Sequence, residues 1–229
     1  MMIMYTVIIL LGGLAGLGME KIAIAMINKR VSQPVANRFS GSLTKTLLWA
    51  VTNALSWFLV VLIGGINGKT IECILILSAC LVITAIDITI RKISNEIILF
   101  ILIVGVIFVF VNNQVSSLDS HIGGFALGFA MFCLPSMIGR GAGWGDVKFA
   151  AVLGFCLGIY DFLTAVIIMT LILLLYTGYI IAKRKGNLKT KIALGPFMAG
   201  GIILVMIINI LNTKWMIFDL QTFLQQTIS

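Results

Sequence analysis

Long apolar runs alternate along the chain with short polar segments that contain most of its charged residues. A helix that crosses a bilayer needs roughly 20 predominantly apolar residues, and repeated runs of about this length predict a polytopic membrane protein. The sixth run is short, and its boundary with the seventh, at 158–161, is the least defined. The pattern predicts one all-α membrane domain over residues 1–229, with about eight transmembrane helices at 4–27, 46–65, 71–90, 96–112, 122–139, 147–160, 162–182 and 192–212.

The composition supports a membrane protein, because 60% of the 229 residues are hydrophobic and only 10% are charged, with a mean hydropathy of +1.14. A soluble domain of this length has more polar surface. The first run lacks a basic leading segment and is too long for a cleaved signal, so we expect a retained anchor. Aromatic residues near one helical face of 213–229 predict a tail along the outer membrane interface.

Lysine and arginine residues give the expected orientation. If the N-terminus is outside, thirteen of them fall in inner loops and only Lys69 and Lys214 in outer ones, with Lys21 inside the first helix. Positive charge prefers the cytoplasmic side, so we expect a multi-pass protein of the cytoplasmic membrane. Topology and anionic lipid explain the net charge of +8, which gives no support to nucleic-acid binding. The inner residues are Lys29, Arg30, Arg38, Lys45, Arg91, Lys92, Arg140, Lys148, Lys183, Arg184, Lys185, Lys189 and Lys191.

Metal and disulfide chemistry are not indicated by the cysteines. All four lie in predicted helices, without a CxxC pair, where burial as small apolar residues is the expected role. The chain has one histidine and no HExxH sequence, so we predict no metal site and no serine–histidine pair.

Two of the eight acidic residues stand out by their position. Asp87 ends the run ILILSACLVITAID, and Asp146 begins the sixth helix, so both lie just within the cytoplasmic boundary. An ionised carboxylate in hydrocarbon costs at least about 2.5 kcal/mol, which makes it a candidate functional residue. Capping a helix would explain Asp146 alone, but two acids at matching depth favour a shared site. Glu72 and Glu96 lie at helix starts, where the helix dipole stabilises a negative charge.

Two carboxylates whose oxygens come within about 3–5 Å cannot both ionise easily, and such a pair holds one proton. The ionised member can take a proton from water as the water attacks a peptide carbonyl, and the protonated member can donate its own. No covalent intermediate, metal or cofactor is required.

The loop before Asp146 is rich in glycine. Gly143 and Gly145 lack side chains, so we expect an extended substrate backbone to come close to Asp146 there. Lys148 lies on roughly the opposite side of a helix from Asp146 and is expected to meet lipid headgroups or substrate.

Three sequence motifs resemble those of the type IV prepilin peptidase family of intramembrane aspartyl peptidases. GWGDVK (143–148) matches the family's GxGDxK signature, and Asp87 is followed after five residues by Ile93-Ser94-Asn95, where the family has Ile-Pro-Asn. ALGPFMAGG (193–201) resembles the Gly-Pro-Phe segment that opens the last helix, at Gly195, Pro196 and Phe197. The three occur in the family's order and cover roughly residues 70–210.

The resemblance implies an aspartic endopeptidase with Asp87 and Asp146 as its catalytic aspartates. Family members remove the short basic leader of type IV prepilins or pseudopilins at the cytoplasmic face of the bacterial inner membrane, typically after a glycine. Many then methylate the new N-terminus with S-adenosylmethionine. The other matched residues, implied to shape the catalytic loops or the substrate approach, are Gly143, Gly145, Lys148, Ile93, Asn95, Gly195, Pro196 and Phe197.

The chain departs from the family at Ser94, which replaces the usual proline, and in the loop at 27–46, which lacks the cytoplasmic insert with two CxxC pairs. The resemblance therefore leaves open whether the product is methylated. Archaeal preflagellin peptidases are close alternatives, whereas presenilin-type proteases pair GxGD with Tyr-Asp and this chain has Ile86-Asp87. An ion-coupled transporter is the alternative of another class, and it predicts acids near the bilayer midplane and inverted repeats.

Overall fold

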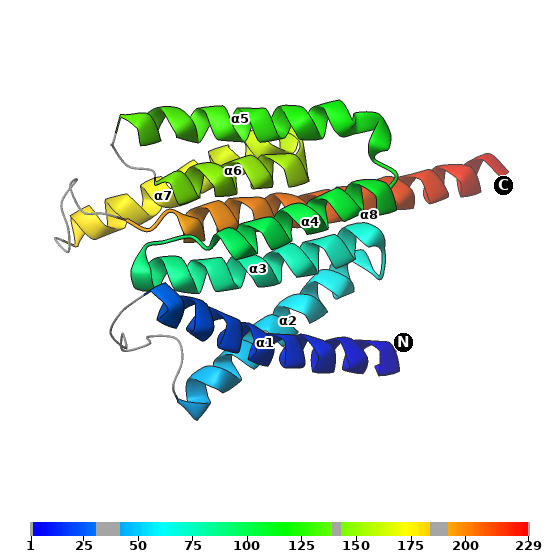
Figure 1. Cartoon of the computed structure of the whole chain (residues 1–229). Coiled ribbons are helices and arrows are strands. Elements are labelled where there is room, and N and C mark those ends of the chain that lie inside the picture. Colours follow the sequence, from blue (N-terminus) through cyan, green and yellow to red (C-terminus); the bar gives the residue numbers. More distant parts are fainter. Residues whose placement is uncertain (1, 31–41, 139–142, 184–191, 229) are drawn as a thin grey trace.

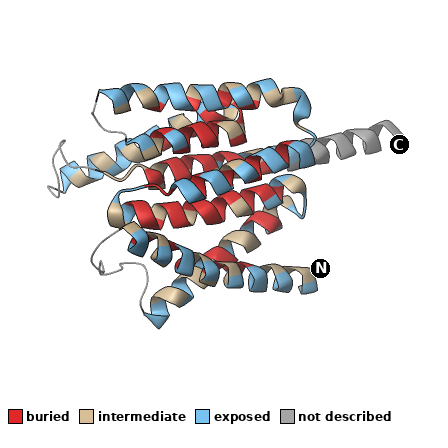
Figure 2. Ribbon diagram, viewed as in Figure 1, coloured by how far each residue is buried: buried red, intermediate tan, exposed pale blue. Residues whose placement is uncertain are grey.

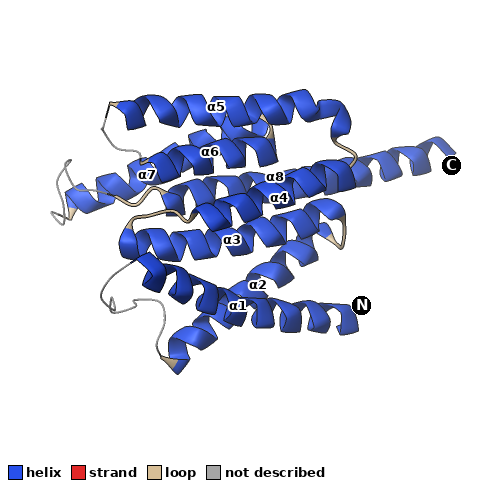
Figure 3. Ribbon diagram, viewed as in Figure 1, coloured by secondary structure: helices blue, strands red, loops and turns tan. Residues whose placement is uncertain are grey.

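The computed structural model describes residues 2–30, 42–138, 143–183 and 192–228, with only the backbone described for residue 2 and for 214–228. The described residues form eight α-helices and no strand, which confirms the predicted all-α architecture (Figures 1 and 3). The helices are α1 (Met2–Arg30), α2 (Leu43–Gly64), α3 (Gly68–Ile90), α4 (Asn95–Val111), α5 (Leu118–Met137), α6 (Trp144–Leu157), α7 (Ile159–Ala182) and α8 (Gly195–Ile228), with a 3-10 turn at Val115–Ser117 before α5.

Six of these helices are long and apolar enough to cross a membrane, so the chain is a multi-pass membrane protein. The exceptions are α4, with 17 residues, and α6, with 14. At a rise of about 1.5 Å per residue, α6 is about 21 Å long, less than the hydrocarbon core of about 30 Å. The predicted interfacial role of residues 213–229 concerns side chains that lie almost entirely outside the described part, although the backbone of α8 continues to Ile228.

The break between α6 and α7 lies at Gly158, inside the segment where the sequence defined the boundary least well. Gly158 has a φ of +76°, a backbone conformation that favours glycine. Its N–H donates to the carbonyl of Gly154 at 2.9 Å, and its own carbonyl accepts from the N–H of Phe162 at 3.1 Å. One residue thus ends one helix and begins the next.

The centre of the bundle is formed by α3, together with α6 and the first part of α8. In α3, 67% of the most apolar window is buried, against 44% in α8 and 11–22% in the four other helices of spanning length. Buried residues also make up most of α6, whereas exposed residues cover much of α1, α2, α5 and α7 (Figure 2). Many of the exposed residues are large and apolar, as contact with lipid requires.

Small residues let α5 and α6 pack closely. Gly124 and Gly128 of α5 face Ala150 and Gly154 of α6, and a methyl group on either Gly124 or Gly154 would overlap the backbone of the other. Such four-residue spacings of small side chains are typical of helix pairs in membranes, where packing takes over from the hydrophobic effect.

Polar side chains join α1, α2 and α3. The side-chain amide of Asn53, which is fully buried, donates to the carbonyl of Gly12 at 2.8 Å, and its oxygen accepts from the hydroxyl of Ser78 at 2.9 Å. The indole of Trp57 donates to the same hydroxyl at 2.8 Å. This network holds the N-terminal helix pair against the central helix.

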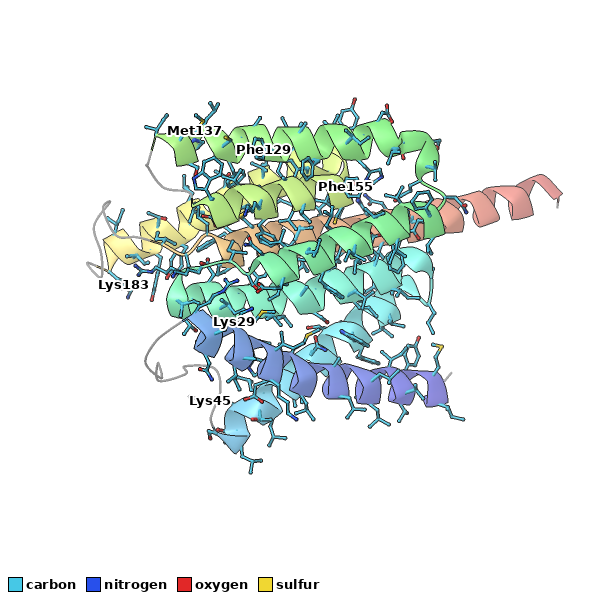
Figure 4. All side chains as sticks on the ribbon, viewed as in Figure 1. Lys29, Lys45, Phe129, Met137, Phe155 and Lys183 are labelled. Atoms are coloured by element: carbon cyan, nitrogen blue, oxygen red, sulfur yellow. The ribbon has the colours of Figure 1, made fainter. Side chains whose placement is uncertain are left out.

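The chain runs up and down, so that α1, α3, α5 and α7 end where α2, α4, α6 and α8 begin (Figure 1). Lys29, Lys45 and Lys183 lie at this end, and both chain termini lie at the other (Figure 4). The sequence predicts that the lysine-bearing end faces the cytoplasm, and we refer to it below as the inner end.

Candidate active site

Asp87 lies in the last turn of α3 at the inner end, where it is 4% exposed. Its Oδ2 atom accepts a hydrogen bond of 2.8 Å from the N–H of Gly195, the first residue of α8. The first N–H groups of a helix have no partner within the helix, and they stabilise a nearby anion. Pro196 follows in the first turn, where its missing N–H is no loss.

Gly195 lies so close to Asp87 that no larger residue fits without rearrangement. A Cβ atom at this position would lie 2.8 Å from Oδ2 of Asp87, 3.1 Å from its Cβ and 3.2 Å from its Cγ. The glycine of the Gly-Pro-Phe motif is therefore a direct neighbour of the first candidate aspartate. Phe197 points elsewhere in the bundle and packs against Tyr176 of α7, with the ring centroids 5.3 Å apart.

Asp146 lies in the first turn of α6 and is partly buried. Its Oδ2 accepts from the N–H of Gly143 at 2.7 Å, as an acidic residue does at the third position of a capping box. Asp146 thus does cap its own helix. The interaction occupies one of the two carboxylate oxygens.

Both aspartates lie at the inner end of the bundle, Asp87 in the last turn of α3 and Asp146 in the first turn of α6. In the described part of the chain, the Oδ1 atom of each residue accepts no hydrogen bond, and neither is sealed from solvent. Each carboxyl is therefore anchored through one oxygen and keeps the other for a water molecule or a peptide bond.

The glycines before Asp146 differ in their surroundings. A Cβ atom on Gly145 would lie 3.2 Å from the Cβ of Ile93, so the space beside this glycine is filled by the α3–α4 turn. This differs from the expectation that Gly145 leaves room for a substrate backbone, and it gives the residue a packing role. Gly143 is exposed, and among the described residues only Oδ2 of Asp146 lies within 4 Å of the corresponding point.

The contact between the α3–α4 turn and the start of α6 contains three further residues that the sequence predicted near the site: Ile93, Asn95 and Lys148. Ile93 is buried, whereas the Lys148 ammonium lies 3.5 Å from the side-chain oxygen of Asn95, at the start of α4. Lys148 thus links α6 to α4 instead of pairing with Asp146. The packing of Gly145 on Ile93 and this contact join the second motif to the segment that follows Asp87.

Residues 74–178 match the family model described as the type IV leader peptidase family. This part of the chain, just under half of its length, is similar to that family. The match supports a peptidase of the type IV leader peptidase kind, and the matched segment includes both Asp87 and Asp146. No curated protein and no solved structure matches the chain.

Two contacts at the candidate site come from residues outside the matched segment and were not predicted from the sequence. Gly195 was expected from its motif, but its contact with Asp87 was not. Arg30, at the end of α1, was counted only as an inner positive charge, yet it contacts the α3–α4 turn through Ile93, Ser94 and Glu96. No local signal in the sequence shows that these distant segments meet.

Glu72 is a further acid whose surroundings differ from the simple helix-start role. It lies at the outer end of α3, is 7% exposed, and its Oε2 accepts from the side-chain amide of Asn112 at 3.0 Å. Within the described residues, no group of three or more His, Cys, Asp or Glu side chains lies close enough to hold a metal ion.

Proposed function

We propose that the chain is an intramembrane aspartyl endopeptidase that removes the leader of type IV prepilins or pseudopilins at the cytoplasmic face of a bacterial inner membrane. The observation that supports this most directly is that Asp87 and Asp146 lie at the same end of the bundle, each anchored through one oxygen by a backbone N–H. The match to the family supports a peptidase activity, and the two carboxyls would supply a chemical means for it.

The proposed reaction needs one proton on the pair. The ionised carboxylate takes a proton from a water molecule, whose oxygen forms a bond to the carbonyl carbon of the scissile peptide. The protonated carboxyl gives its proton to the carbonyl oxygen, so that a neutral tetrahedral diol forms. When the diol collapses, the C–N bond breaks, a proton passes to the leaving nitrogen, and the leader is released with a new carboxyl end.

The fixed oxygens explain how the pair keeps its geometry. Backbone N–H donors hold Oδ2 of Asp87 and Oδ2 of Asp146, so both side chains have defined orientations before substrate arrives. Preorganisation of this kind removes the need to reorient charged groups during the reaction. The position of the two aspartates at the inner end of the bundle supports cleavage at a membrane boundary.

We propose that the apolar segment of the substrate docks laterally, from the bilayer. An apolar cavity of about 220 Å³ lies between α2 and α3, and it is lined in part by Trp49, Leu81 and Ala85. Ala85 precedes Asp87 by two residues on α3, so the cavity lies at a similar depth to Asp87 but on a different side of the helix. A substrate helix against this face would place its cytoplasmic end at the depth of the aspartates, and its extended segment would have to pass around the end of α3.

A preflagellin-type peptidase would use the same two aspartates, so only the identity of the substrate distinguishes this alternative from a prepilin peptidase. The peptidase itself is proposed to need no cofactor. Methylation of the new N-terminus with S-adenosylmethionine is a further prediction. None of the described residues indicates where that cofactor would bind, and no step of the proposed reaction depends on it.

The test is co-expression of the chain with a type IV prepilin in three forms: wild type, Asp87→Asn and Asp146→Asn. The asparagine keeps the size of each side chain and removes its acid–base chemistry, so we expect folded protein and loss of cleavage in both variants. The mass of the pilin reports leader removal, and an additional mass of about 14 Da reports methylation. Full cleavage by either variant would refute the aspartyl mechanism.

A further inference from the structure

The guanidinium of Arg30 contacts three residues of the turn between α3 and α4. Its Nη1 donates to the carbonyl oxygen of Ile93 at 3.1 Å, and its Nη2 donates to Oε2 of Glu96 at 2.9 Å and to the hydroxyl of Ser94 at 3.3 Å. The Ser94 hydroxyl in turn donates to Oε2 of Glu96 at 2.6 Å. We call residues 93–96 the inner turn.

The inner turn is connected to both segments that carry the aspartates. It follows the end of α3, which bears Asp87. In addition, the buried side chain of Ile93 fills the space beside Gly145, the residue that precedes Asp146. A movement of the inner turn is therefore expected to shift the start of α6 relative to the end of α3.

Ser94 leaves the inner turn without the stiffness that a proline supplies. Proline restricts φ to about −65 ± 15°, whereas serine is free to leave this range. Ser94 has a φ of −81° and a ψ of 123°, which a proline can also adopt. In this chain, hydrogen bonds from outside the inner turn hold it in that conformation.

An arginine is suited to this task because its planar group donates several hydrogen bonds in fixed directions. The Arg30 side chain is 21% exposed and that of Glu96 is 47% exposed. Exposed ion pairs contribute little to stability, so the effect of Arg30 is expected on geometry and not on folding.

We propose that Arg30 is a positioning residue, which fixes the inner turn and thereby the placement of Asp146 relative to Asp87. This inference rests on the proposed peptidase function. It assigns to α1, which lies outside the segment that matches the family, a direct part in the geometry of the site.

The first test compares steady-state cleavage of a prepilin by purified wild type, Arg30→Gln, Arg30→Lys and Lys29→Gln. Lys29 is the matched control, because it is the adjacent positive charge and, among the described residues, forms a polar contact only with Glu96, at 3.5 Å. We expect Arg30→Gln to lower kcat at least about tenfold with an almost unchanged KM, as misplacement of a catalytic group does. Arg30→Lys should resemble Arg30→Gln, since an ammonium group cannot donate hydrogen bonds in the fixed directions of the planar guanidinium.

The second test asks whether a proline can replace the hydrogen bonds of Arg30. Ser94→Pro, introduced into Arg30→Gln, is expected to restore kcat to within about threefold of wild type by fixing φ. Ser94→Ala in the same background should restore nothing. A failure of Ser94→Pro to rescue, or wild-type kcat in Arg30→Gln or Arg30→Lys, overturns the proposal.

A third test needs no peptidase activity. Cysteines in place of Ile93 and Gly145 would have their Cβ atoms about 3.2 Å apart, close to the usual separation of about 3.5–4.5 Å in a disulfide. Mild oxidation followed by mass analysis of the linked peptides should show rapid coupling with Arg30 present and at least about tenfold slower coupling in Arg30→Gln. Equal coupling rates overturn the inference. Absence of prepilin cleavage by wild type with unequal rates overturns the peptidase proposal alone.

Discussion

A single methyl group at Gly195 provides a sharp test of the site. In Gly195→Ala, the new Cβ atom would lie 2.8 Å from Oδ2 of Asp87, a separation that real side chains do not show. The two further contacts, at 3.1 and 3.2 Å, involve the Cβ and Cγ atoms of the same aspartate, so a small rotation cannot relieve all three. Either Asp87 or the start of α8 has to move.

The expected magnitude follows from the hydrogen bond that this movement breaks. The N–H of Gly195 donates to Oδ2 of Asp87 at 2.8 Å, and a hydrogen bond to a charged group contributes about 1.5–3 kcal/mol. If this interaction is lost together with the placement of the carboxyl, kcat falls by about 10- to 150-fold. The overall fold is retained, because the strain is limited to one helix start.

The assay is cleavage of a prepilin by the purified variant in lipid vesicles, with thermal unfolding measured in parallel. Gly200→Ala is the matched control, since it adds the same methyl group to the same helix and, among the described residues, meets only the end of Ile172, at 3.8 Å. Equal kcat in Gly195→Ala and Gly200→Ala, with both proteins folded, would show that Gly195 does not position Asp87.

Two further predictions concern the packing of the bundle. Gly154→Val should lower the unfolding free energy by about 1–3 kcal/mol, the usual cost of overpacking, because the new side chain overlaps the backbone of Gly124. The control is Gly178→Val, since no atom of the described residues lies within 4 Å of a Cβ at that position. Equal stabilities of the two variants would contradict the close α5–α6 contact. Asn53→Ala should lower the unfolding free energy by about 0.6–1.7 kcal/mol, the range of interhelical hydrogen bonds in membranes, since Gly12 and Ser78 lose a hydrogen-bond partner. Ser56→Ala removes a hydrogen bond to Thr52 within the same helix and should have a smaller effect in the same denaturant titration.

The helices could be predicted from the sequence because a bilayer leaves the backbone few choices. Each polar group of the backbone must be satisfied within its own segment, so an apolar run of sufficient length becomes a helix. The differences occur where apolar residues continue past a helix end, as at Ile192 and Ala193, which precede α8 without belonging to it. The position of Asp87 and Asp146 at the inner helix ends could also be predicted, because both acids border long apolar runs; their catalytic role stays a prediction, based on the cost of a carboxylate next to hydrocarbon.

The supporting residues could not be predicted in this way, because their roles depend on contacts between distant segments. Gly143 and Gly145 are equivalent in the sequence motif, yet one is exposed and the other packs against Ile93. Glu96 lies at the start of a helix, as expected, but its carboxylate also accepts a hydrogen bond from Arg30, which lies 66 positions earlier in the chain. Spacing along the chain does not contain this information.

The placement of the two aspartates therefore depends on parts of the chain that the family match does not cover. Asp87 is held by a residue 108 positions away in α8, and the turn beside Asp146 is held by the last residue of α1. Both contacts reach the matched segment, 74–178, from outside it. In the proposed reaction, the matched segment contains the reacting groups, and contacts from α1 and α8 hold the segments that carry them. Substitutions at Gly195 and Arg30 should consequently change the rate of cleavage more than the stability of the bundle.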